Sequence, residues 1–128
     1  MKQTSIAIII KNEKVLLEKR KDTEDNYAGL YALPGGHMKE QETPEQALVR
    51  EIKEELNIEI TKYKKLLPVP DIDPTSGKEY IHHTFLIQEW KGEIKETKEQ
   101  EKLVWANLNE IHILPNISKP TMKALRQL

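Results

Sequence analysis

The hydrophobic residues of this chain occur in short runs separated by turn-forming residues, which indicates a mixture of strands and helices. Residues 5–10 form an isoleucine-rich run that predicts a buried strand. A second apolar run at residues 15–17 continues into basic residues 19–21 and predicts another strand. Asn12 and Glu13 lie between the two runs as a turn, so we expect the strands to form a hairpin.

Further along the chain, apolar segments alternate with segments rich in turn formers. The segments expected to be strands are 58–67, 80–90 and 103–106, with a short apolar piece at 30–33 that the Pro34-Gly35-Gly36 breaker ends. The segments expected to be loops are 21–29, 68–78 and 91–102. In the strand at 80–90, Ile81, Phe85 and Ile87 share one face.

The clearest helix begins after Thr43. Thr43 is a good N-cap, Pro44 suits the first helical position, and Gln46 stands where a capping box requires it. Good helix formers follow at residues 47–56, and Asn57 stands where a left-handed residue would end the helix. A second helix is expected at residues 118–128. Interleaved strands and helices predict a single α/β domain over residues 1–128, with a mixed sheet and helices on both faces.

Composition excludes several classes of function. The 128 residues carry 20 basic and 21 acidic side chains, so the chain lacks the basic charge of a nucleic-acid binder. The absence of cysteine excludes a disulfide scaffold, a thiolate zinc site and a cysteine nucleophile. No segment has the length of a membrane span or the pattern of a signal peptide, so a cytoplasmic location without membrane contact is expected. The oligomeric state is not readable, and a homodimer stays open.

An acidic face on the helix is the first indication of chemistry. At 3.6 residues per turn, Glu51, Glu54 and Glu55 lie on one stripe, away from the apolar stripe that packs into the core. A solvated charged face, partly neutralised by Arg50, is one interpretation. The other is a site for a hard cation, because a carbonyl of the nearby Gly35-Gly36 turn adds to the oxygen ligands that Mg²⁺ prefers.

The segment from residue 36 to residue 58, GHMKEQETPEQALVREIKEELNI, resembles the Nudix box, whose pattern is G-x₅-E-x₇-R-E-U-x-E-E-x-G-U with U a bulky aliphatic residue. The matching residues are Gly36, Glu42, Arg50, Glu51, Ile52, Glu54, Glu55 and Ile58. Asn57 replaces the Gly of the pattern, at a position that closes the helix and binds no metal. So many fixed positions make a chance match improbable. The resemblance implies a Nudix-type α/β/α sandwich with a mixed central sheet.

The same resemblance assigns roles to these residues. It implies that Glu51, Glu54, Glu55 and the Gly35 carbonyl hold Mg²⁺, for which Mn²⁺ can substitute, and that Glu51 is a candidate to activate water. Arg50 is expected to orient Glu51 and to pair with Glu42, which would support the Gly36 turn from outside the ligand set. An additional acidic ligand is expected from a late loop, with Glu99 the first choice and Glu96 and Glu101 as rivals.

Substrate-binding residues are less sharply indicated. Lys19 and Arg20 end the second strand, where they are candidates for phosphate contacts, although surface positions fit them as well. Aromatic side chains can stack on a base, which makes Tyr27, Tyr31, His83 and Phe85 candidates, with a core position favoured for Phe85.

The box predicts a reaction more firmly than a substrate. We expect metal-dependent hydrolysis of a diphosphate linkage in a nucleoside-diphosphate compound, in the first instance a nucleoside triphosphate cleaved to monophosphate and pyrophosphate, as in MutT-type members. Pro74 lies one residue from a mark of ADP-ribose hydrolases, so ADP-ribose or a nucleoside diphosphate sugar is the alternative. A non-catalytic nucleotide sensor is the alternative of another class, but such modules usually lose carboxylates that this box keeps.

Overall fold

The computed structural model describes residues 1–21, 27–95 and 102–128. Its centre is a mixed sheet built around β1 (Lys2–Lys11), which pairs in parallel with β7 (Glu79–Lys91) and antiparallel with β2 (Lys14–Lys19). Asn12 and Glu13 both have positive φ values of 52° and 64°, as a tight hairpin turn requires. The predicted hairpin of the first two strands is therefore confirmed.

The remaining strands extend this framework. The short strand β3 (Tyr31–Ala32) and β8 (Lys102–Asn107) flank β2, β5 (Glu59–Lys65) and β6 (Val69–Ile72) pair with β7, and β4 (Gly35–His37) pairs with β1. The sheet is mixed, as predicted, because β1 and β7 run parallel while the other pairings are antiparallel.

One loop prediction was wrong in part. The segment at 68–78 contains β6, whose Pro70 is tolerated because, among the described strands, β6 pairs only with β7. The Pro34-Gly35-Gly36 breaker follows the end of β3, as predicted, but strand structure resumes directly after Pro34. Gly35 and Gly36 begin β4 and lie opposite Ile6 and Ser5 of β1. Glycine at these positions lets another backbone approach closely, which a breaker rule does not capture.

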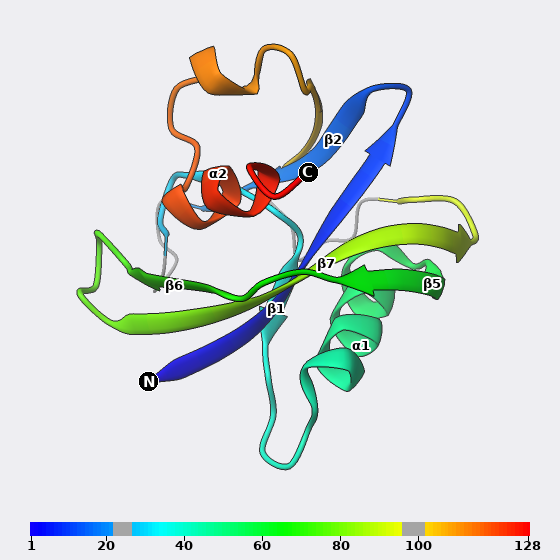
Figure 1. Ribbon diagram of the computed structural model, residues 1–128, viewed down its shortest axis with the longest axis horizontal. Helices are drawn as coiled ribbons and strands as arrows, with labels where there is room; N and C mark the ends of the chain where they lie inside the picture. Colours follow the sequence, from blue (N-terminus) through cyan, green and yellow to red (C-terminus); the bar gives the residue numbers. More distant parts are fainter. Residues whose placement is uncertain (22–26, 96–101) are drawn as a thin grey trace.

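Two helices cover opposite faces of the sheet (Figure 1). The first, α1 (Pro44–Leu56), buries Leu48, Ile52 and Leu56 against one core, and α2 (Lys119–Leu125) buries Ala124 in the other. Successive residues of β1 contribute to the two cores in turn, with Ala7 on the α1 side and Ile8 on the α2 side. This is the α/β/α sandwich that the sequence predicted.

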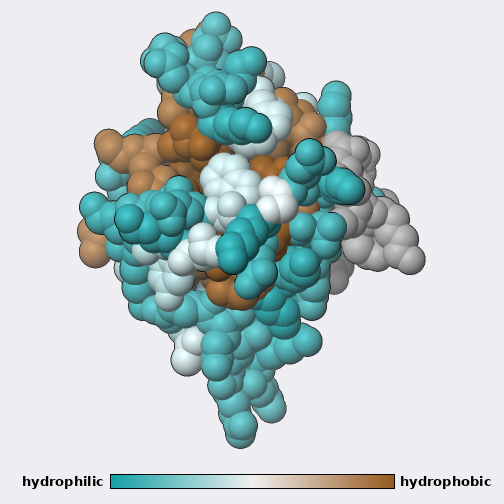
Figure 2. Space-filling model, turned by 90° about the vertical axis from the view of Figure 1, so that its right-hand side faces the viewer, coloured by the Kyte–Doolittle hydropathy of each residue, from teal (hydrophilic) through white to brown (hydrophobic). Residues whose placement is uncertain are grey.

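The surface is mixed in character. Figure 2 shows that hydrophobic residues gather in the upper part of one side of the molecule, while the lower part is almost entirely hydrophilic. None of the described helices is long and apolar enough to cross a membrane.

Candidate active site

Local signals fix the helix that carries the acidic face. The Thr43 side chain accepts from the Gln46 N–H and the Gln46 side chain accepts from the Thr43 N–H, which completes the predicted capping box. Asn57 ends the helix in the left-handed conformation (φ 57°, ψ 34°), and its N–H donates to the Lys53 carbonyl. The start and the end of α1 are therefore both fixed relative to the core.

Arg50 is the centre of the charged groups on this helix. Its Nε and one terminal nitrogen donate to the two carboxylate oxygens of Glu42 at 2.7 and 2.9 Å. The other terminal nitrogen donates to Glu51 Oε1 at 2.8 Å and lies 3.4 Å from Glu54 Oε2. A further bond, of 3.0 Å, reaches the His37 carbonyl of β4. Both contacts expected of Arg50 are thus present, and the guanidinium ties the box turn to the helix.

The Arg50–Glu42 pair also shifts protonation. Hydrogen bonds from Arg50, together with the Lys39 N–H, lower the pKa of Glu42 to about 2. The hydrogen bond to Glu42 and the contact with Glu51 raise the pKa of Arg50 above its ordinary value. Glu42 therefore stays a carboxylate and Arg50 stays a cation over the whole range in which an enzyme works.

The two glycines of β4 bring the helix carboxylates to the strand. A Cβ on Gly36 would fall 2.4 Å from the carboxylate carbon of Glu51, so only glycine leaves Glu51 in place. A Cβ on Gly35 would fall 2.1 Å from the Ser5 carbonyl oxygen, and its φ of 151° is also unfavourable for other residues. The Gly35 N–H donates to Glu55 Oε1 at 3.2 Å. Glu51 and Glu55 therefore both lie against the Gly35–Gly36 backbone.

These groups suit a hard cation without forming a closed metal site. No group of three or more acidic or histidine side chains that could hold a metal ion was found among the residues that the structure describes. Arg50 holds Glu51 and contacts Glu54, whose side chain is 57% exposed, while Glu55 points to Gly35. Mg²⁺ usually binds through one or two carboxylates, keeps several waters and takes up substrate phosphates. The carboxylates of Glu51 and Glu55 beside the backbone of Gly35 fit that requirement.

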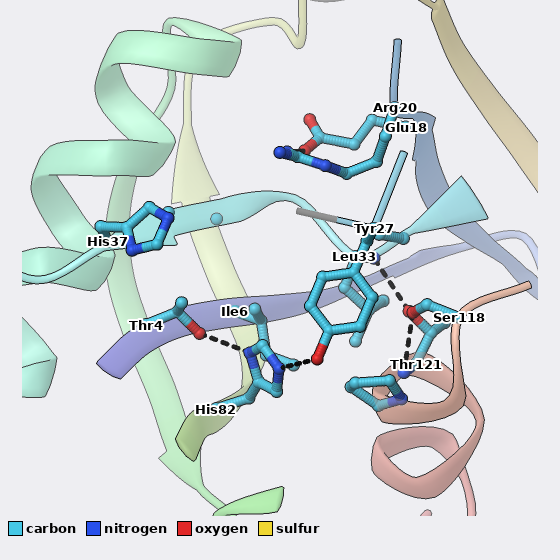
Figure 3. Close-up of a pocket in the computed structure, with 14 residues that line it drawn as sticks. Thr4, Ile6, Glu18, Arg20, Tyr27, Leu33, His37, His82, Ser118 and Thr121 are labelled. Carbon is cyan, nitrogen blue, oxygen red and sulfur yellow. Dashed lines mark hydrogen bonds and ion pairs between the residues drawn. The ribbon is translucent and has the colours of Figure 1, made fainter. Parts of the chain in front are cut away.

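A pocket opens on the other side of the same glycine backbone. Its walls come from β1, β2, β3, β4, β7 and α2 and from the segments next to them (Figure 3). Its lining residues are Thr4, Ile6, Glu18, Arg20, Tyr27, Ala32, Leu33, Gly35, Gly36, His37, His82, Ser118, Pro120 and Thr121. The cavity volume is about 70 Å³, well below the roughly 300–1,000 Å³ of pockets that enclose a whole ligand. It can therefore enclose one edge of a nucleotide while the rest lies outside.

Polar side chains in this pocket form a hydrogen-bonded chain (Figure 3). Thr4 Oγ1 lies 2.7 Å from His82 Nδ1, and His82 Nε2 lies 2.9 Å from the Tyr27 hydroxyl. The Tyr27 hydroxyl donates to Asp71 Oδ2 at 3.0 Å. Burial, followed by the nearby His37 and His83, lowers the pKa of His82 to about 4, so its imidazole is neutral near pH 7.

The loop that follows β6 holds this series of hydrogen bonds in place. Asp73 is fully buried and accepts from the Tyr27 N–H at 3.1 Å, from Ser76 Oγ at 2.6 Å and from Thr75. Burial alone would raise the pKa of Asp73, but these hydrogen bonds outweigh it and lower the pKa. Asp73 is therefore a buried anion whose bonds anchor the backbone at Tyr27.

The residues predicted to bind substrate fall into two groups. Arg20 and Tyr27 line the pocket, whereas Lys19, His83 and Phe85 are not among its lining residues. Phe85 is fully buried in the core on the α1 side, as favoured. His83 bonds to Gln3 on that same side of β7, because it alternates with His82 along the strand.

Tyr27 differs from its expected setting. It is only 4% exposed, and its ring packs against Tyr80 and His82 with centroids 5.6 and 5.4 Å away. The expectation that Tyr27 offers an open face for stacking is therefore wrong, and its contribution lies in its hydroxyl group. Glu99, with its rivals Glu96 and Glu101, lies outside the described residues.

Sequence reasoning missed the polar residues of the pocket. Thr4, His82, Ser118 and Thr121 were not singled out, although Tyr80, His82 and Thr84 alternate along β7 and are all buried. That alternation of polar and aromatic residues on one face of a strand is the signal that would have found His82.

Comparison with known proteins agrees with this architecture. A family model described as NUDIX domain matches residues 1–127. The crystal structure of a MutT NUDIX hydrolase from Burkholderia pseudomallei superimposes with a TM-score of 0.87 at 30% identity, covering 99% of this chain and 97% of that one. The chain therefore belongs to the Nudix family, whose members generally use divalent metal cations.

Three relatives carry the names of different nucleotide hydrolases. An ADP-ribose pyrophosphatase of Methanocaldococcus jannaschii is 40% identical over 81% of this chain, and the matched part spans 60% of that protein's length. An 8-oxo-dGTP diphosphatase of Proteus vulgaris is 35% identical over 69% of this chain and 76% of its own length. A CTP pyrophosphohydrolase of Escherichia coli is 34% identical over 81% of this chain and 74% of its own length.

Proposed function

We propose that this protein is a Nudix pyrophosphohydrolase that uses Mg²⁺ to cleave a nucleoside triphosphate into a monophosphate and pyrophosphate. The observation that carries the proposal is the position of the Gly35–Gly36 backbone, which has the Glu51 and Glu55 carboxylates on one side and a pocket on the other. One end of the substrate can occupy the pocket while its phosphates reach the carboxylates of Glu51 and Glu55. The names of the relatives from Proteus vulgaris and Escherichia coli support a nucleoside triphosphate.

The charged residues have distinct tasks in this reaction. A bound divalent metal would offset the negative charge of the phosphates and make a water more acidic. Glu51 and Glu55 would hold it beside Gly35, with Glu54 as a more exposed ligand. Glu51 is also the candidate to take the proton of the attacking water, and Arg50 orients its carboxylate through the 2.8 Å bond. Glu42 acts through Arg50, which it holds by two hydrogen bonds.

The pocket would receive the base. Arg20 lines it and can meet the sugar or a phosphate, while Lys19, on the same strand, remains a candidate for a phosphate outside it. Nucleotides of this kind are cytoplasmic metabolites, and we place the protein there.

A second candidate substrate is ADP-ribose, favoured by the relative from Methanocaldococcus jannaschii. It shares the diphosphate but carries a second ribose that would have to lie beyond the acidic side. A purely binding role is the third alternative, and the retained carboxylates of the box argue against it.

Turnover against a panel of nucleotides would test the proposal. The panel contains the nucleoside triphosphates, their oxidised forms, ADP-ribose and nucleoside diphosphate sugars, each with Mg²⁺, with Mn²⁺ and with excess chelator. We expect pyrophosphate release from a triphosphate that stops with chelator. Release of AMP from ADP-ribose as the fastest reaction would favour the second candidate, and binding without any hydrolysis would favour the third.

A further inference from the structure

We infer that Thr4 presents only a hydrogen-bond acceptor to the pocket, so that the pocket prefers bases with an amino group over their oxo counterparts. Cytosine should bind better than uracil, and adenine better than hypoxanthine. The inference rests on the proposed function only in taking this pocket as the site of the base.

Strand pairing places Thr4 between two other residues that line the pocket. In the sheet Thr4 lies between His37 of β4 and His82 of β7, and all three line the pocket. Two residues further along β1, Ile6 lies beside Gly35, which has no side chain to fill the space above the sheet. Thr4 is only 4% exposed, so a ligand atom that reaches its hydroxyl leaves water behind. An unsuitable partner at this point therefore costs binding free energy.

The direction of each hydrogen bond follows from counting hydrogens. Tyr27 has one hydroxyl hydrogen, which it donates to Asp71, since a carboxylate can only accept. His82 Nε2 must then carry a hydrogen and donate it to the Tyr27 oxygen. A neutral imidazole with a hydrogen on Nε2 has none on Nδ1, so Nδ1 accepts from Thr4 Oγ1. The Thr4 hydroxyl has no second hydrogen, and it offers the pocket lone pairs alone.

The surroundings hold this direction fixed. Lys123 Nζ lies 4.0 Å from Asp71 Oδ1, while the Tyr27 hydroxyl donates to the other carboxylate oxygen, Oδ2. Asp73 anchors the Tyr27 backbone, and Tyr80 and His82 pack against the Tyr27 ring, so the ring and its oxygen are held in place. Burial keeps His82 neutral, with a pKa of about 4, and a neutral ring is the condition on which the count depends.

A series of hydrogen bonds with this fixed direction distinguishes amino groups from oxo groups on the base. An amino group donates a hydrogen to Thr4, whereas an oxo group in the same place sets two acceptors against each other and leaves both unpaired. A lost bond together with unpaired buried groups corresponds to a preference of roughly tenfold to a hundredfold. The ring nitrogen beside this group also differs, because it accepts in cytosine and adenine and carries a hydrogen in uracil and hypoxanthine. The contribution of Thr4 is therefore the part of the ratio that is lost when its hydroxyl is removed.

Binding to the full chain without metal, measured by titration calorimetry, would test the inference. The probes are the pairs CMP with UMP and AMP with IMP, whose members differ by an amino or an oxo group at one ring position and by the hydrogen on the adjacent ring nitrogen. The variants are Thr4→Val, which removes the acceptor, and Tyr27→Phe, which keeps the ring but frees the His82 hydrogen. Thr4→Ser restores a hydroxyl, and Tyr63→Phe is the matched control because Tyr63 lies outside the pocket, against Phe85.

We expect the amino member to bind at least about tenfold more tightly in the wild type, in Thr4→Ser and in Tyr63→Phe. In Thr4→Val and Tyr27→Phe the ratio should fall toward one, a change that a general loss of stability would not produce. Equal binding in the wild type, a preference for the oxo member, or an unchanged ratio in either variant would overturn the inference.

The same measurements separate this inference from the proposed function. Hydrolysis of triphosphates without an amino preference would overturn the inference and leave the proposed function standing. An amino preference in binding, in a protein that hydrolyses none of the panel, would support the inference and overturn the proposed function. If none of the four monophosphates binds, the pocket is not the base site and the inference is overturned.

Discussion

The carboxylate of Glu51 lies directly against the Cα of Gly36, in space that a side chain at position 36 would occupy. Gly36 does not have a positive φ, so alanine fits its backbone without strain. We therefore expect Gly36→Ala to fold normally but to displace Glu51 and lower kcat by about a hundredfold or more, the scale seen when one catalytic group is lost. Steady-state kinetics and thermal unfolding of the variant would measure the two effects.

Gly77→Ala is a suitable control for that variant. A Cβ on Gly77 meets no atom within 4 Å, but its φ of 74° disfavours alanine. This variant should lose about 1 kcal/mol of stability and keep its kcat. Full activity in Gly36→Ala would show that the position of Glu51 is not required.

Removal of single carboxylate charges should distinguish the glutamates of α1 that bind metal from those that do not. Glu54→Gln and Glu55→Gln keep the shape of each side chain, and we expect each to lower turnover by roughly a hundredfold. Stability without metal should hold or rise, because negative charges at neighbouring helix positions repel one another. Glu45→Gln, which alters an exposed glutamate of the same helix that pairs with Lys65, should retain wild-type turnover. Wild-type turnover in both box variants would contradict the assignment of these residues as ligands.

The left-handed end of α1 predicts an asymmetric response at Asn57. Glycine adopts a φ of 57° without penalty, so Asn57→Gly should leave the melting temperature unchanged or slightly higher. Asn57→Ala should lose about 1 kcal/mol, because a Cβ without a compensating side-chain amide disfavours this conformation. Chemical unfolding of both variants would measure the difference. A large loss in the glycine variant would reveal a role of the Asn57 side chain.

Glu42 should make stability depend on acidity. Its pKa is about 2 in the folded protein, below the ordinary value of 4.5 that applies to the unfolded chain. The stabilisation is therefore complete above about pH 4.5 and is lost as the pH falls toward 2, because the unfolded chain takes up the proton first. Glu42→Gln removes this contribution. Its free energy of unfolding should be lower than that of the wild type at pH 6 and should decline less steeply between pH 5 and pH 3. Parallel curves for the two proteins would contradict the assignment.

The sequence predicted those parts of the fold that local signals control. Thr43, Gln46 and Asn57 specify the ends of α1 through bonds within a few residues, and the hairpin turn at Asn12 and Glu13 is equally local. The contacts of Arg50 with Glu42 and Glu51 follow from the box, because those residues lie on or beside one helix.

The pocket could not be predicted in this way because its residues meet through distant strand pairing. Thr4 and His82 become neighbours only through the parallel register of β1 and β7. Phe85 and His83 were candidates on general grounds, but one step along a strand reverses the face on which a side chain lies. For the same reason, the burial of Tyr27 depends on Asp71 and Asp73, which no local pattern connects with it.

The parallel pairing of β1 with β7 also has a consequence for how the chain reaches its native state. Thr4 and His82 are 78 positions apart, and eight consecutive residues of β1 pair across this interval. Contacts that close such long loops slow folding, because chain entropy is lost before the contacts are formed. During synthesis, the apolar residues 6–9 cannot pair with β7 until residues 84–87 have emerged from the ribosome. During that interval the edge of β1 that pairs with β7 lacks its partner strand, and an unpaired apolar edge is prone to aggregation.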